Sequence, residues 1–250
     1  MTRSFDAHQA KISLFDALVD ARQTYGAKKP ILEDQERNPL SYTDLIRAAF
    51  ALGRKIAAFT SPGEHVGIML PASSAAVVTF FALHAFGRTP TMLNFTAGIR
   101  NLKAACELSQ VKRVLTSHRF VEQGKLHDLI DALETLTTVT YLEDVRATVG
   151  LSDKLFAAAA GAFPKRFRAA TKPSDPGVIL FTSGSFGAPK GVVLSQENLI
   201  VNVQQVAHHI ALDPAWVMFN RLPTFHCFGL TGGVLLPILK GMKGFQYPSP

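Results

Sequence analysis

Residues 177–194 have the sequence GVILFTSGSFGAPKGVVL, and this stretch decides the fold. Two apolar runs, Gly177 to Thr182 and Gly191 to Leu194, each have the length and composition of a buried strand. Between them lies a short segment of Gly, Ser, Pro and Lys, which is typical of a tight connection. The stretch therefore predicts two strands joined by a glycine-rich loop.

The loop carries the groups that a polyphosphate requires. Glycines let the backbone turn tightly and point several N–H groups at one anion. Thr182, Ser183 and Ser185 add hydroxyl donors, and Lys190 adds a full positive charge suited to phosphate oxygens. Composition alone leaves a second interpretation open, in which the loop is a plain hairpin and Lys190 an ordinary exposed lysine beside a turn.

The loop is not a Walker A phosphate loop. That motif places Ser or Thr directly after its Gly-Lys pair and opens a helix. Here Pro189 precedes the lysine, Gly191 follows it, and a strand comes next.

Upstream of the loop, strand patterns and helix patterns alternate. A helix is expected through Leu45 and Ile56, with Ser41 and Asp44 as a capping box in front of it. Further helices are expected at 73–86, 99–108 and 119–133, and strands at 66–70, 89–93, 111–116 and 137–142. Such alternation with short connections predicts an α/β fold with mostly parallel sheets and helices on both faces.

The pattern changes after this first unit. Residues 146–176 contain an alanine run, a basic cluster and two prolines, and we expect a short helix followed by a connecting loop. Downstream of the glycine loop we expect a helix capped by Ser195, an apolar unit at 216–222, a buried helix at 229–239 and a strand at 245–247. We therefore expect a first α/β unit at about 1–145, a connector at 146–176 and a loop-containing unit at 177–250.

Composition limits the class of protein. Of 250 residues, 47% are hydrophobic and 18% charged, which is a globular composition. No apolar stretch reaches the roughly 18–20 residues that span a bilayer, and residues 1–6 lack the apolar core of a secretory signal. Cys106 and Cys227 are too few for a disulfide framework, so a reducing cytoplasm is expected, with the inner face of a bacterial membrane as a further possibility.

The formal net charge is +7, and the basic residues are scattered, which gives no nucleic-acid motif. Their densest cluster is Lys165-Arg166-Phe167-Arg168. It is interpreted either as a solvated loop or as a contact with a membrane or an acidic carrier protein.

Two other groups of residues are candidates for a reactive or metal-binding site. Cys227 beside His226 is a weak candidate for a thiol nucleophile, because adjacent residues of a strand point to opposite faces. His208 and His209 have no third ligand at metal spacing, so no metal ligand is assigned.

The ordered string of the loop is more specific than its composition. It resembles the phosphate loop of the adenylate-forming (AMP-binding) superfamily, [ST]-S-G-[ST]-[TE]-G-x-P-K-G. The matching positions are Thr182, Ser183, Gly184, Ser185, Gly187, Pro189, Lys190 and Gly191. Phe186 departs, since the family has Thr or Glu there and Phe has no polar group for a phosphate or a magnesium shell.

Other segments extend the resemblance. Residues 222–229, LPTFHCFG, are similar to the family's second motif, and residues 66–71 and 87–94 are similar to its earlier strands. More narrowly, residues 141–144, 153–154 and 226–233 resemble the acyl-[acyl-carrier-protein] synthetase part of the bifunctional 2-acylglycerophosphoethanolamine acyltransferases.

The resemblance implies the N-terminal part of the adenylate-forming fold and a two-step reaction. A carboxylate attacks the α-phosphate of ATP with Mg²⁺, and a thiol then takes the acyl group from acyl-AMP. The catalytic residues implied are Lys190 and His226, and the nucleotide would contact residues 182–191. The substrate-binding residues implied are Phe225, His226, Gly229 and Gly232. His226 as a core histidine, and the glycines as sites of tight packing, remain alternatives.

Complete members of the superfamily are longer than this chain, and their mobile C-terminal lid domain has no counterpart in it. The expectation is that the chain alone does not complete adenylation. For the parent protein, three alternatives stay open. They are a synthetase joining fatty acids to acyl carrier protein for phospholipid acyl recycling, a ligase using coenzyme A, and a non-catalytic nucleotide- or acyl-binding module. Peripheral membrane association of the parent is a further expectation.

Overall fold

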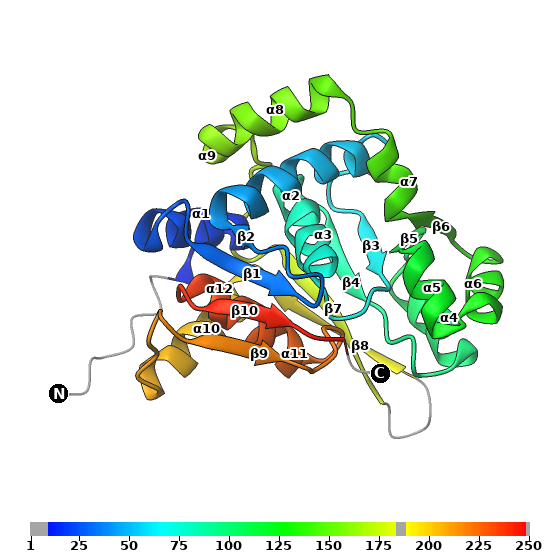
Figure 1. Cartoon of the computed structure of the whole chain (residues 1–250). Coiled ribbons are helices and arrows are strands. Elements are labelled where there is room, and N and C mark those ends of the chain that lie inside the picture. Colours follow the sequence, from blue (N-terminus) through cyan, green and yellow to red (C-terminus); the bar gives the residue numbers. More distant parts are fainter. Residues whose placement is uncertain (1–9, 184–188, 249–250) are drawn as a thin grey trace.

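The computed structural model describes residues 10–183 and 189–248, whose strands form two sheets (Figure 1). The larger sheet has the strand order β6-β5-β3-β4-β7-β8 and the smaller one β2-β1-β10-β9. The larger sheet contains β3 (His65–Ile68), β4 (Thr89–Met92), β5 (Arg113–Thr116), β6 (Thr138–Tyr141), β7 (Pro176–Ser183) and β8 (Pro189–Ser195). The smaller sheet contains β1 (Pro30–Asp34), β2 (Leu40–Ser41), β9 (Val217–Asn220) and β10 (Lys243–Gln246).

Parallel pairing dominates both sheets. Among the strand pairs of the described residues, only β7–β8 and β1–β2 are antiparallel. The predicted α/β class with mostly parallel sheets is confirmed. Parallel strands need crossover connections, and helices supply them here.

The helices fall into three groups along the chain. The first group is α1 (Leu14–Tyr25), α2 (Tyr42–Ala57), α3 (Ser74–Ala85) and α4 (Ile99–Leu108). The second is α5 (His118–Gly124), α6 (His127–Glu134), α7 (Leu142–Ala147), α8 (Leu151–Ala162) and α9 (Pro164–Phe167). The third is α10 (Gln196–His209), α11 (Cys227–Leu230), the π-helical segment η2 (Thr231–Leu235) and α12 (Leu236–Leu239).

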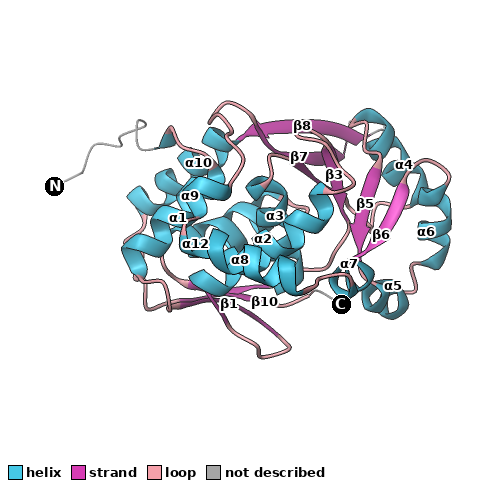
Figure 2. Cartoon of the chain, turned by 90° about the horizontal axis from the view of Figure 1, so that it is seen from above, coloured by secondary structure: helices cyan, strands magenta, loops and turns pink. Residues whose placement is uncertain are grey.

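Helix α3 lies between the two sheets. It contacts β3 and β4 of the larger sheet and β1 of the smaller one (Figure 2), and nine of its twelve residues are buried. A helix that is apolar all round is expected in such a place. The opposite face of the larger sheet packs Met69 and Val114 against Leu102 of α4 and Leu133 of α6 in a second core cluster. The larger sheet therefore has helices on both faces, as predicted.

Serine caps fix the starts of the longer helices. The predicted capping box of α2 is confirmed: Ser41 Oγ accepts from the Asp44 N–H at 3.2 Å, and Asp44 Oδ2 accepts from the Ser41 N–H at 3.1 Å. Ser195 caps α10, as expected from the sequence, and Ser73 caps α3.

Three expectations need correction. The helix expected at 119–133 is two helices, because Lys125 adopts a left-handed conformation (φ 51°) between α5 and α6. Residues 146–176 hold the twelve-residue helix α8 and a short α9 in place of a short helix and a loop. The buried helix expected at 229–239 begins earlier, at Cys227, and contains the π-helical segment.

The smaller sheet joins the two ends of the described chain. β1 pairs with β10, with Leu32 opposite Gly244, and neither β1 nor β2 was expected from the sequence. In the larger sheet, β7 pairs with β4 through Thr91 and Ile179. Strands from the first and the last expected unit therefore share both sheets.

Candidate functional site

The two strands predicted on either side of the glycine-rich loop are β7 and β8, and the structure pairs them antiparallel. Register places Thr182 opposite Lys190 and Phe181 opposite Gly191. The expected site residues Gly184, Ser185 and Gly187, together with Phe186, lie outside the described residues, and of Ser183 only the backbone pairing with Pro189 is described.

Lys190 and Thr182 lie where the two strands enter the loop. Side chains of directly opposed residues share one face of a hairpin, and both of these side chains are exposed. Among the described residues, no salt bridge involves Lys190. An ammonium and a hydroxyl thus stand side by side at the entrance to the loop, where both are accessible to an anion.

Gly191 is not required by lack of space. A Cβ atom there would lie 3.5 Å from the side chains of Leu108 and Phe181, which is an ordinary packing distance.

The segment at 222–229, which resembles the family's second motif, is held in place by Phe225. This ring is buried, lies 5.0 Å from the ring of Phe95 in an edge-on arrangement, and contacts the His226 ring at 4.8 Å. His226 itself is exposed and occupies the N-cap position of α11, where its side chain makes no capping hydrogen bond. The alternative of a core histidine is therefore wrong, and the imidazole is free to meet a ligand from solvent.

The start of the glycine-rich loop and the 222–229 segment both lie at the carboxyl ends of the parallel strands of the larger sheet. In the parallel pair β4–β7, Thr91 lies opposite Ile179. Phe95 and Ser183 both follow that pair by four residues, at the carboxyl ends of their strands. Since Phe95 contacts Phe225, the segment before His226 and the start of the glycine loop lie along one edge, where ligands of open α/β sheets bind.

Close packing accounts for Gly229, one of the two expected pocket glycines, and for the neighbouring Gly233. A Cβ at Gly229 would lie 2.1 Å from the carbonyl oxygen of Pro223, and one at Gly233 would lie 2.2 Å from the Asn220 side chain. Gly232 is less constrained, with the exposed Phe228 ring at 3.2 Å. The packing alternative thus has direct support at Gly229 and Gly233.

A buried amide pair escaped the sequence analysis. Asn220 Nδ2 donates to Gln246 Oε1 at 2.8 Å, and Gln246 Nε2 donates to the carbonyl of Gly233 at 2.9 Å. The pair links β9 and β10 to η2. Single π-helical turns frequently occur at functional sites, and the nearest sequence signal was the Gly232-Gly233 pair.

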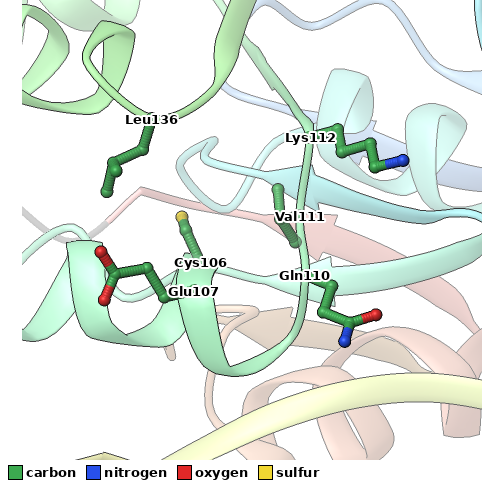
Figure 3. A pocket seen from close by; sticks show the side chains of 6 residues that line it. All are labelled: Cys106, Glu107, Gln110, Val111, Lys112 and Leu136. Carbon is green, nitrogen blue, oxygen red and sulfur yellow. The ribbon is translucent and has the colours of Figure 1, made fainter.

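Two surface hollows lie away from these segments. One, of about 290 Å³, lies beside Cys106, Val111 and Leu136 and is shown in Figure 3. Burial raises the pKa of the Cys106 thiol to about 12, so the thiolate is disfavoured there. Cys227, the other cysteine, is exposed at the first position of α11 and not in a strand.

The metal and membrane expectations can be compared with the described part of the chain. No group of three metal-ligating side chains occurs within residues 10–183 and 189–248, where His208 and His209 lie exposed on α10. In the same residues, no helix combines the length and apolar character needed to cross a bilayer.

Comparison with known proteins places these features in a family. The model of the AMP-binding enzyme family matches residues 19–249. Acyl-CoA ligase sidI of Beauveria bassiana is 29% identical over 192 residues, covering 75% of this chain and 33% of the relative. Medium-chain-fatty-acid–[acyl-carrier-protein] ligase TtuA of Teredinibacter turnerae is 39% identical over 71 residues, covering 28% of this chain and 11% of the relative.

The fold is shared with solved structures. The ATP-bound MatB from Rhodopseudomonas palustris superposes with a TM-score of 0.78 at 22% identity, covering 96% of this chain and 46% of MatB. The chain thus spans less than half the length of that protein and about a third of sidI. A family model matching nearly the whole chain, together with this fold, shows that the chain belongs to the AMP-binding enzyme family.

Proposed function

We propose that this chain is the nucleotide- and acyl-binding part of an ATP-dependent acid–thiol ligase that activates a fatty acid as acyl-AMP. The observation that carries the proposal is the hairpin at residues 182–191, in which an exposed Lys190 stands opposite Thr182 at the carboxyl edge of a parallel sheet. Membership in the AMP-binding family and the relation to acyl-CoA ligase sidI support this class of reaction.

The donor set at the hairpin suits a triphosphate. Lys190 would neutralise the charge of the β- and γ-phosphates, and Thr182 would donate a hydroxyl hydrogen bond beside it. The backbone of the loop, including Gly184 and Gly187, would supply N–H donors. ATP, when bound, supplies the electrophilic phosphorus, so the protein's task here is to position and neutralise it. Mg²⁺ would accompany the nucleotide, and no ligand for it is assigned to this chain.

The second segment would hold the carboxylic acid. His226, exposed at the start of α11, would position the carboxylate, while the buried Phe225 keeps the segment against the sheet. Gly232, next to the exposed Phe228 ring in η2, would line the acyl group with backbone, whereas the space beside Gly229 is filled by the Pro223 carbonyl. The positioning of two reactants on one rigid edge is itself a large part of such catalysis.

The thiol acceptor is proposed to be acyl carrier protein, with phospholipid acyl recycling as the role of the whole protein. The relation to TtuA over a short region and the net charge of +7, which suits an acidic carrier, favour this choice. Coenzyme A is the second candidate, because sidI is an acyl-CoA ligase. Thioester formation by a full-length protein offered each thiol separately distinguishes the two.

Calorimetric titration of the chain with MgATP tests the nucleotide site. Lys190→Ala is expected to weaken binding by roughly tenfold or more, the usual value of a charge-assisted contact. Lys172→Ala is the matched control, because Lys172 is an exposed lysine just before β7, at the strand end remote from the loop. Equal affinity of the Lys190 variant and the wild type would refute the proposed role.

A non-catalytic nucleotide-binding module is the other candidate function, and Phe186 in the phosphate loop favours it. Fatty-acid-dependent exchange between ATP and pyrophosphate separates the candidates, measured on a full-length protein. The ligase is expected to show exchange, and the binding module to show none.

A further inference from the structure

An unpartnered apolar face runs along α8. On α8 the side chains of Leu151 and Leu155 are 73% and 64% exposed, with the exposed Ala158 and Ala162 on the same side, and Phe163, directly after the last residue of α8, is 66% exposed. The opposite side of the helix is buried against α2. Several large apolar side chains this exposed on one short segment are uncommon on a soluble surface and indicate a binding face.

The carboxylates around this face are all paired. Asp153 is held by Lys55 at 2.8 Å and by Arg54 at 3.5 Å. Asp20 pairs with Lys165 at 2.7 Å, and Asp16 pairs with Arg168 at 2.7 Å. These ion pairs also fasten α8 and α9 to α2 and α1, so the face is rigid.

The cations of the face exceed its carboxylates. Lys154 and Arg166 are exposed, and no salt bridge within the described ranges involves either of them. In the basic cluster at 165–168, Lys165 and Arg168 therefore pair with carboxylates of α1, whereas Arg166 is available to a partner. The face presents apolar side chains flanked by uncompensated positive charge.

A hollow of about 560 Å³ lies next to the stripe, between the end of α1 and α9. Its lining residues include the cations Arg22, Lys165 and Arg166, of which Arg22 donates to the Gly161 carbonyl and Lys165 pairs with Asp20, together with Phe163 and Val19. Cations above apolar walls match a phosphate group attached to a hydrocarbon chain.

We propose that α8 and α9 form a docking surface for an anionic phospholipid bilayer. Leu151, Leu155 and Phe163 would enter the region between headgroups and acyl chains, while Lys154 and Arg166 contact lipid phosphates. In Figure 1, α8 is the outermost helix, above α2 and on the side away from β9, so nothing in the described fold prevents it from lying flat on a membrane. The proposal is independent of the nucleotide site.

Vesicle flotation of the whole chain tests this surface. Vesicles of equal parts phosphatidylcholine and phosphatidylglycerol are expected to carry the protein, and vesicles of phosphatidylcholine alone are not. The combined variant Lys154→Glu and Arg166→Glu is expected to lower partition by at least roughly fivefold for each cation. The variant Leu155→Ser is expected to lower it roughly tenfold, because the lost burial of one leucine is of that size.

Matched controls distinguish this face from the general charge of the chain. Arg100→Glu alters an exposed cation on α4, and Ile210→Ser alters a half-exposed apolar side chain after α10. Both control variants are expected to partition onto the vesicles as the wild type does. Only variants with the thermal stability of the wild type are compared. Absence of binding to the mixed vesicles, or equal losses in the controls, would overturn the proposal. Lipid-free dimers that Leu155→Ser dissociates would overturn it in favour of a second copy.

Discussion

The ring of Phe225 lies 5.0 Å from the ring of Phe95 at an interplanar angle of 84°. Phe95 in turn packs edge-on against Phe120 at 4.8 Å. Because Phe95 follows β4 and Phe225 precedes His226, this row of rings fastens the α11 segment to the carboxyl edge of the larger sheet. The position of the exposed His226 therefore depends on its buried neighbour Phe225.

Removing the anchor ring should destabilise the fold. Phe225→Ala is expected to lower the free energy of unfolding by about 3–5 kcal/mol, since it deletes a buried ring and leaves a cavity. Urea denaturation followed by circular dichroism measures the change. Phe228→Ala is the control, because that ring is 71% exposed, and a change within about 0.5 kcal/mol is expected. Equal losses in the two variants would contradict the anchoring role.

The contact between Gly233 and Asn220 predicts a steric effect. A Cβ at residue 233 would meet the buried Asn220 amide, which cannot withdraw without leaving its hydrogen bond to Gln246. Gly233→Ala should therefore lower the free energy of unfolding by about 1–3 kcal/mol.

The matched control is Gly150→Ala, where the nearest atom beside a new Cβ is 3.9 Å away and the backbone is extended. Thermal melting of both variants measures the difference. A Gly233 variant as stable as the Gly150 variant would show that η2 can shift to accept the methyl group.

Local sequence patterns predicted most strands and helices of the larger sheet. The smaller sheet was not predicted, because its strands pair over a long distance in the sequence. Helical spacing and serine caps placed α2, α3 and α10, since those signals lie within a few residues. The strand β1, by contrast, gains its partner β10 more than two hundred residues later, and no local signal encodes that pairing. The break at Lys125 was missed because a lysine in a left-handed conformation has no mark in the sequence.

In the candidate site, too, local features were predicted from the sequence and features that depend on long-range packing were missed. The order of residues in the loop predicted its two strands, and the structure brings Thr182 and Lys190 opposite each other. Exposure of His226 could not be derived, because it depends on the packing of Phe225 against Phe95, a residue far away in the sequence. The amide pair Asn220–Gln246 was missed because a buried polar side chain resembles a surface one in sequence.

A buried histidine predicts how stability depends on pH. His84 lies in α3 between the two sheets, 4.7 Å from the Phe80 ring, and its Nε2 has no hydrogen-bond partner. Burial lowers the pKa of His84 from 6.5 to about 4, with the Gly177 backbone opposing the shift. The unfolded chain therefore takes up the proton first as the pH falls.

This contribution to stability is complete above pH 6.5 and is lost as the pH falls toward about 4. The loss should be on the order of 3 kcal/mol. Urea midpoints measured across that window should fall for the wild type and stay flatter for His84→Gln, with the exposed His208→Gln as control. A wild-type slope retained in His84→Gln would assign the pH dependence to other groups.

Phe186 offers a gain-of-function test of the loop. It occupies the one loop position that departs from the family pattern, and its ring offers no polar group to a phosphate. Phe186→Thr adds one hydroxyl and should tighten MgATP binding by roughly two- to tenfold, the value of one net hydrogen bond. Calorimetry on the whole chain measures this gain. Phe186→Leu removes the ring without adding a donor and should leave the affinity unchanged. If both variants tighten binding equally, the bulk of the Phe186 ring, rather than its missing hydroxyl, limits the nucleotide site.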